Sequence, residues 1–347
     1  MKITKKIVES QHGDITLYTL TNVSGASVVL SSLGAGIVSV RVPDKDGKLE
    51  NVALGYANPA DYMADGPCAG KVPGRYANRI AGGKLRVDGK DYQLAINNGP
   101  NALHGGPTGF QNRVWNSRIA GDTVVFYRTS PDGEENFPGT VEVEAAYTWS
   151  DSNTLTLELT ATTDAATVVN LTNHCYWNLE GENAGSVLDH TLYLAASRYL
   201  PTDSTLIPTG EMAPVEGTPM DFTEPKTLGR DIKEAFKALE YGKGYDNCWV
   251  IDSYTRGAMK TAAVLEAPHS GRVLEVATTQ PAVQIYTGNW LAGCPKNVEG
   301  RSYDDYDGVA IECQGMPDSP HHPDFPSMQL YPGEVYNEII EFKFSTK

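Results

Sequence analysis

The chain has 347 residues, of which 40% are hydrophobic and 20% charged, and its formal net charge is −15 at pH 7. This composition is typical of a globular protein, and the negative charge argues against nucleic acid or an anionic membrane as a partner, because both attract basic surfaces. No run of about 18 apolar residues predicts a membrane span, and no apolar signal segment follows the basic N-terminus.

The first half contains three pairs of alternating segments joined by turn residues. The turns are Asp46-Gly47, Asp88-Gly89 and Asp151-Ser152-Asn153. Asp-Gly between alternating segments is a strong hairpin signal, because these residues tolerate the backbone of a tight turn. The pattern therefore predicts antiparallel strands in pairs: 40–42 with 49–52, 84–87 with 91–94, and 141–147 with 154–159.

Two loops of the first half carry hydrogen-bond donors. Residues 74–80 place Asn78 and Arg79 after a proline turn, where they could hold the hydroxyls of a sugar. Residues 101–106 place His104 before two glycines, which let the backbone approach a ligand closely. Taken alone, the first loop favours a structural arginine at a strand end, and the second favours a surface histidine in a turn.

The run from Val168 to Leu179 alternates and is predicted to form one strand. His174 falls on its hydrogen-bonding face, which indicates either a wet concave site or a structural histidine satisfied by its neighbours. One face carries Val169, Leu171, Asn173, Cys175 and Trp177; the other carries Asn170, Thr172, His174, Tyr176 and Asn178.

Helical pattern is scarce in the rest of the chain. Residues 230–239 form the best candidate, with a second short one around 59–63. Asp246 lies between a glycine-flanked loop and the apolar run 248–251. An aspartate in a turn commonly caps its own backbone, so its functional and structural interpretations both stay open.

Two later runs, 282–287 and 309–314, also alternate like strands. Gln284 and Tyr286 share one face of the first, and Glu312 points away from the apolar face of the second. A buried carboxylate requires a partner, whereas an exposed strand face would leave Glu312 solvated. An acid, a base and neutral donors are what proton transfer on a polyhydroxylated substrate requires.

These elements predict an all-β fold. No linker or repeat interrupts the chain, so we expect one large antiparallel β domain over residues 1–347 with a few short helices. The five cysteines are odd in number and include no C-x-x-C pair, which predicts reduced thiols and a cytoplasmic location. The adjacent His321 and His322 are poorly spaced for a shared metal, and dinucleotide, Walker and serine-hydrolase motifs are absent.

Several segments, in this order, resemble the aldose 1-epimerase (galactose mutarotase) family over nearly the whole chain. The resemblance implies a single large antiparallel β-sandwich with the site in a cleft across the sheet, and no metal or organic cofactor. The matching segments are 74–80 (GRYANRI), 101–106 (NALHGG), 170–174 (NLTNH), 217–222 (GTPMDF), 244–246 (GYD), 284–289 (QIYTGN) and 311–314 (IECQ).

Carried over position by position, the resemblance implies that Glu312 is the general base and His174 the general acid. It implies sugar-binding roles for a further set of residues. These are Asn78, Arg79, His104, Asp246 and Gln284. The expected enzyme is a mutarotase that interconverts the α and β anomers of free aldohexoses such as glucose and galactose, as a monomer or weak homodimer.

Three other functions stay open at the level of sequence. A glycoside hydrolase could use Asp246 and Glu312 as its carboxylate pair, a mechanism decided by their separation. A related fold could also bind sugar without turnover. A phosphosugar epimerase would need additional basic residues near the site, and none is identified.

Overall fold

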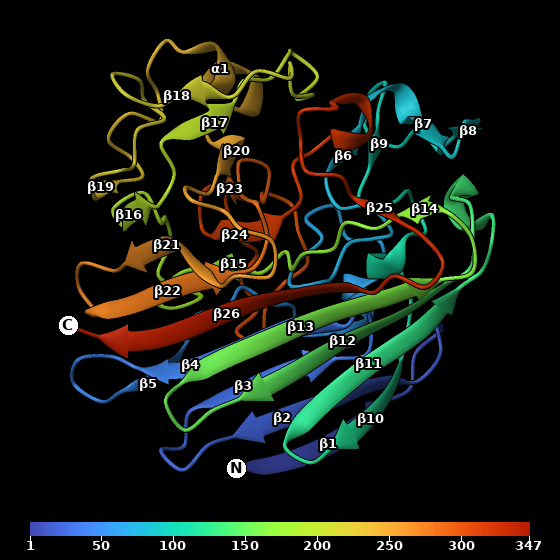
Figure 1. Cartoon of the computed structure of the whole chain (residues 1–347). Helices are drawn as coiled ribbons and strands as arrows, with labels where there is room; N and C mark the ends of the chain where they lie inside the picture. Colours follow the sequence, from blue (N-terminus) through green and yellow to red (C-terminus); the bar gives the residue numbers. More distant parts are fainter.

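The computed structural model describes all residues of the chain, 1–347. Strands make up nearly all of its regular structure (Figure 1). They form sheets of nine, six and five strands and three sheets of two strands. Every pairing between these strands is antiparallel, which confirms the predicted fold class. None of the helices has the length and apolar character needed to cross a membrane.

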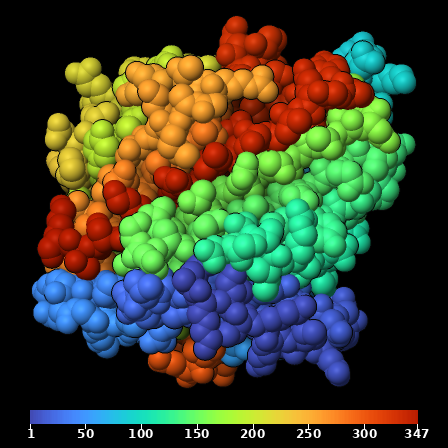
Figure 2. Space-filling view, turned by 60° about the horizontal axis from the view of Figure 1, so that its bottom comes forward, coloured from blue at the N-terminus to red at the C-terminus, as the bar shows by residue number.

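The five-stranded and nine-stranded sheets form two layers of the fold. In Figure 2 the red β26 runs between orange and green segments, in agreement with its place between β22 and β13. The five-stranded sheet has the order β1 (Lys2–Val8), β2 (Ile15–Thr21), β3 (Ser27–Ser31), β4 (Gly36–Pro43) and β5 (Leu49–Asn51). The nine-stranded sheet has the order β10 (Asn116–Ala120), β11 (Thr123–Ser130), β12 (Val141–Trp149), β13 (Thr154–Thr163), β26 (Tyr336–Thr346), β22 (Arg272–Thr278), β21 (Lys260–Glu266), β16 (Thr191–Leu194) and β19 (Lys226–Thr227).

These two sheets pack face to face. The ring of Tyr18 in β2 lies edge-on to Phe126 in β11 at 5.9 Å, and the indole of Trp149 donates to the carbonyl of Ala26 at 3.2 Å. Alternate side chains of each strand enter the shared interior, as the period-two pattern requires. A cluster of 61 buried hydrophobic residues results, which includes members from both sheets. The predicted β-sandwich is therefore confirmed.

The six-stranded sheet packs against the nine-stranded sheet. The ring centroid of Trp177 lies 5.2 Å from that of Phe342 and 5.4 Å from that of Phe344, and both phenylalanines are in β26. Every residue of its inner strands β20 and β24 is buried, so polar side chains on them must find partners within the protein. The sheet has the order β15 (Tyr176–Trp177), β24 (Val309–Gln314), β23 (Ala282–Tyr286), β20 (Asp246–Val250), β17 (Arg198–Leu200) and β18 (Ala213–Pro214).

Short elements complete the fold. The two-stranded sheets are β6 (Arg79–Ile80) with β9 (Ala102–Leu103), β7 (Lys84–Val87) with β8 (Lys90–Gln93), and β14 (Thr167–Val168) with β25 (Gln329–Leu330). The helical elements are α1 (Lys237–Gly242) and the 3-10 turns η1 (Pro59–Tyr62), η2 (Ala81–Gly83), η3 (Phe110–Asn112), η4 (Glu134–Asn136) and η5 (Ser319–His321).

Most local predictions are confirmed. The three predicted hairpins are β4–β5, β7–β8 and β12–β13, and the short helical turn near 59–63 is η1. The predicted helix at 230–239 is wrong in extent, because α1 begins only at Lys237 and has six residues. Phe236 precedes it with extended backbone, and its N–H is used in a turn to the carbonyl of Glu234.

The predicted single strand at 168–179 is also wrong. β14 ends at Val168 and β15 begins at Tyr176, with no regular strand between them. The intervening backbone forms hydrogen bonds with irregular loops instead of a neighbouring strand. The backbone N–H of Asn170 donates to the carbonyl of Arg75 at 3.1 Å, and the backbone N–H of His174 donates to the carbonyl of Lys71 at 2.9 Å. Alternation alone does not reveal that the partner of a segment is a loop.

Candidate active site

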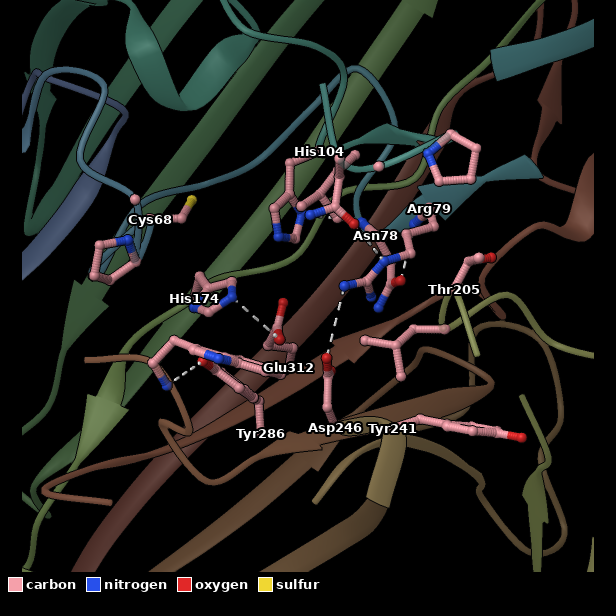
Figure 3. A pocket seen from close by; sticks show the side chains of 18 of the residues that line it. Cys68, Asn78, Arg79, His104, His174, Thr205, Tyr241, Asp246, Tyr286 and Glu312 are labelled. Carbon is pink, nitrogen blue, oxygen red and sulfur yellow. Dashed lines mark hydrogen bonds and ion pairs between the residues drawn. The ribbon is translucent and has the colours of Figure 1, made fainter. Parts of the chain in front are cut away.

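A pocket of about 500 Å³ lies over the six-stranded sheet (Figure 3). Six of the seven predicted site residues line it: Asn78, Arg79, His104, His174, Asp246 and Glu312. The seventh, Gln284, does not line the pocket. Segments that lie more than 200 residues apart in the sequence, such as those of Asn78 and Glu312, thus converge on one cavity.

Pairing of β6 with β9 joins the two loops of the first half. Arg79 lies opposite Leu103 in this pair, and the backbone N–H of His104 donates to the carbonyl of Asn78 at 3.0 Å. Asn78 and His104 both have positive φ, 63° and 52°. This left-handed backbone is uncommon for residues other than glycine, although asparagine tolerates it best. The turns aim both side chains toward the pocket.

His104 is a neutral hydrogen-bond donor. The backbone N–H of Asn78 donates to its Nδ1 at 3.1 Å, so the ring proton must lie on Nε2. Burial lowers the pKa of His104 well below its usual value, and the nearby His174 and Arg79 lower it further. An uncharged N–H aimed at the pocket suits a sugar hydroxyl.

Asp246 is held by two donors. Its Oδ2 lies 3.7 Å from Nη2 of Arg79 (Figure 3). Its Oδ1 accepts a hydrogen bond of 2.7 Å from the side-chain amide of Gln284. Gln284 is almost completely buried, in the strand next to β20. The structure therefore places Gln284 behind Asp246, where it fixes the orientation of that carboxylate.

His174 and Glu312 face each other across the floor of the pocket. Nε2 of His174 lies 3.4 Å from Oε1 of Glu312, and the residues are only 5% and 2% exposed. Glu312 stands in the middle of β24, directly opposite Gln284 of β23. Its second oxygen, Oε2, is buried without a hydrogen-bond partner. An unpaired carboxyl oxygen beside an imidazole provides a group able to exchange a proton with a bound molecule.

Burial shifts both groups of this acid–base pair toward their neutral forms. It raises the pKa of Glu312 well above its usual value; Asp246 adds to this increase, and Arg79 opposes it. It lowers the pKa of His174 to about 4, and the charge of Lys71 acts in the same direction. Both shifts favour a protonated carboxyl group and an uncharged imidazole, whereas the roles implied by the resemblance require a carboxylate and an imidazolium.

Aromatic rings form one side of the pocket. The ring of Tyr176 lies 5.1 Å and that of Tyr286 6.2 Å from His174, and Trp290 stacks on Tyr286 at 6.4 Å. Tyr176 and Tyr286 share strand faces with predicted residues, which is a signal that the sequence contained. Other lining residues had no such signal. They include Asn98, Thr205, Tyr241 and Trp290.

The site therefore combines one acid–base pair with several fixed donors and acceptors for a neutral molecule. This arrangement can move a proton onto one oxygen of a polyhydroxylated ligand and away from another. The structure contains no group of three or more His, Cys, Asp or Glu side chains placed to hold a metal ion. The five cysteines are all buried and unpaired.

Comparisons with known proteins agree with this site. The family model for aldose 1-epimerase matches residues 16–343. Galactose mutarotase from Homo sapiens is 43% identical over 320 residues, which cover 92% of this chain and 91% of that protein. Aldose 1-epimerase from Escherichia coli (strain K12) is 37% identical over 331 residues, which cover 94% of each chain.

Solved structures give the same result. An aldose epimerase homologue from C. elegans superposes with a TM-score of 0.87 at 31% identity, over 99% of both chains. Galactose 1-epimerase from Lactobacillus acidophilus superposes with a TM-score of 0.85 at 28% identity, over 100% of this chain and 99% of that one. With the family model matched along nearly its whole length, the chain belongs to the aldose 1-epimerase family.

Proposed function

We propose that the protein is an aldose 1-epimerase that interconverts the α and β anomers of free aldohexoses such as glucose and galactose. The observation that carries this proposal is the buried contact of 3.4 Å between His174 and Glu312 at the floor of a pocket lined by neutral and charged hydrogen-bonding groups. Opening of a pyranose ring requires one proton to leave the C1 hydroxyl and another to reach the ring oxygen.

In the proposed mechanism, Glu312 takes the proton from the C1 hydroxyl while His174 gives one to the ring oxygen. The C1–O5 bond breaks and the open-chain aldehyde forms, so one proton enters the pair as another leaves. After rotation about C1–C2, the aldehyde is attacked from its other face by the C5 hydroxyl. His174 then takes the proton of that hydroxyl, and Glu312 returns one to the C1 oxygen.

Sugar binding itself prepares the required charges. A C1 hydroxyl that donates to Glu312 stabilises the carboxylate, and Arg79 already lowers the pKa of Glu312. The ring oxygen accepts a stronger hydrogen bond from a protonated imidazole than from a neutral one. Both contacts favour transfer of the shared proton from Glu312 to His174, so the active charge state is promoted by the substrate that uses it.

We assign sugar binding to Asn78, Arg79, His104 and Asp246, with Gln284 acting through Asp246. His104 offers an N–H because its Nδ1 is occupied by the backbone of Asn78. Arg79 offers the N–H groups that its contact with Asp246 leaves free. These neutral and paired groups suit an uncharged sugar.

The test is polarimetry of freshly dissolved α-glucose and α-galactose. The approach to the equilibrium rotation should accelerate in proportion to protein concentration, and the Glu312→Gln control should lose most of this acceleration at pH 7. Galactose binding without acceleration would favour a sugar-binding protein. Hydrolysis of a nitrophenyl glycoside would favour a glycosidase, although both oxygens of Asp246 are already engaged by Arg79 and Gln284.

We also propose that residues 1–347 fold as one domain and that the enzyme acts in the cytoplasm as a monomer or weak homodimer, without a metal or organic cofactor. The cytoplasmic assignment is supported by the five unpaired cysteines, and the monomer by a pocket that one chain lines without help. A single calorimetric transition and a monomer mass in analytical ultracentrifugation are the expected results.

A further inference from the structure

Asn98 and Asp246 contact the guanidinium of Arg79 at different nitrogens. Nε of Arg79 donates to Oδ1 of Asn98 at 3.0 Å, while Nη2 lies 3.7 Å from Asp246. A guanidinium is planar and carries five N–H donors in fixed directions. Two contacts at different nitrogens therefore define both its position and its plane, and the remaining N–H groups keep a set direction in the pocket.

The loop that carries Asn98 is itself braced. Asn98 and Asn101 exchange backbone hydrogen bonds of 3.1 and 3.0 Å across a tight turn. The amide of Asn101 donates to Oγ1 of Thr205 at 3.1 Å and accepts from the N–H of Gly82 at 3.0 Å. The turn is thereby tied to two other segments, so the side chain of Asn98 is offered to Arg79 from a defined place on the pocket wall.

Asn98 is uncharged, and this affects how strongly Arg79 acts on the pKa of Glu312. Arg79 lowers the pKa of Glu312 and Asp246 raises it, so the net effect on the acid–base pair depends on how much of the arginine charge is neutralised. An amide oxygen orients the guanidinium without adding a second negative charge. A carboxylate at the same position would reduce the effect of Arg79 on Glu312.

We infer that Asn98 is a positioning residue of the epimerase: it orients Arg79 toward the hydroxyls of the bound sugar and leaves the arginine charge available to Glu312. This inference rests on the proposed function. It goes beyond it by adding a residue that belongs to none of the segments on which the family resemblance rests.

The first variant to measure is Asn98→Ala. Loss of one neutral hydrogen bond to Arg79 should raise KM roughly five- to tenfold. The value of kcat should stay within about twofold, because an interaction made equally in the ground and transition states affects binding alone. The conservative Asn98→Asp keeps an acceptor for Arg79, so its KM should stay near that of the wild type. Its negative charge should move both limbs of the pH profile of kcat/KM to higher pH.

A matched control comes from the neighbouring residue. The side chain of Asn97 forms hydrogen bonds of 2.7 and 3.0 Å with the backbone of Leu103 and none with Arg79. Asn97→Ala disturbs the same loop, so a KM increase equal to that of Asn98→Ala would attribute the effect to the loop and overturn the inference. Unchanged KM in Asn98→Ala would overturn it as well.

A double-mutant cycle tests whether Asn98 acts through Arg79. In an Arg79→Ala background, Asn98→Ala should change KM by less than about twofold, because its partner is already absent. Additive effects would refute the inference even when Asn98→Ala alone is impaired. Absence of mutarotation in the wild type would instead refute the proposed function, so the two failures are distinguishable.

Discussion

Glu312→Gln should leave an enzyme whose residual activity rises as the pH falls. In this variant His174 remains as the only titrating member of the acid–base pair, and burial holds its pKa at about 4. The protonated fraction of His174 is then about one in a thousand at pH 7 and about one in ten at pH 5. Between these values the residual rate should increase roughly tenfold per pH unit.

The wild type should behave differently over the same range. The raised pKa of Glu312 keeps a proton on the pair at pH values above the pKa of His174, so kcat/KM should depend on pH less steeply than the rate of the variant. At pH 7 the variant should lose about 10²–10⁴ in kcat, the usual value of a positioned general base or acid. The assay is polarimetry from pH 5 to 7, after subtraction of the spontaneous rate measured in each buffer.

Glu338→Gln is the matched control. Burial raises the pKa of Glu338 to about 7, and this glutamate accepts a hydrogen bond from Thr279, but it does not line the pocket. Its replacement removes a buried carboxyl group without touching the chemistry, so mutarotation should be unchanged. A Glu312→Gln variant with near-wild-type rate at pH 7, or with a rate independent of pH, would refute the reasoning; Asp246 would then be the first alternative base.

Local sequence patterns predicted the strands that carry Gln284 and Glu312, because alternation follows from strand geometry alone. They also placed Cys175 and Trp177 in the main core and His174 toward the site, although the strand expected there is interrupted. The alternation was therefore correct for the residues closest to β15, although most of the predicted strand is absent.

Contacts between segments that are distant in the sequence could not be predicted from local patterns. Gln284 was expected to bind sugar, and only the register between β23 and β20 reveals that it lies behind Asp246. The contact of Asn98 with Arg79 depends on how two loops meet. The pKa shifts of His174 and Glu312 have the same origin, since burial by the whole fold is their first cause.

Arg79→Ala should raise KM while the circular dichroism spectrum stays that of the wild type; an unfolded variant would show that Arg79 is structural. Dialysis against a strong chelator should leave activity unchanged, and a loss restored by a divalent metal would contradict the cofactor-free proposal. His190→Gln should make the protein less sensitive to acid. Nε2 of His190 accepts a hydrogen bond of 3.0 Å from the N–H of Leu179, and burial lowers its pKa from 6.5 to about 4. In the unfolded chain this histidine binds a proton below about pH 6.5, whereas in the folded protein it does so only below about pH 4. The free energy of unfolding therefore decreases as the pH falls between these values. The full difference is about 3 kcal/mol at pH 4 and nearly zero at pH 7. Glutamine can accept a hydrogen bond from the N–H of Leu179 but does not titrate. Between pH 7 and pH 4, the free energy of unfolding measured with urea should therefore fall by about 3 kcal/mol less in the variant than in the wild type. Equal losses in the two proteins would mean that the fold does not lower the pKa of His190, which would refute this prediction.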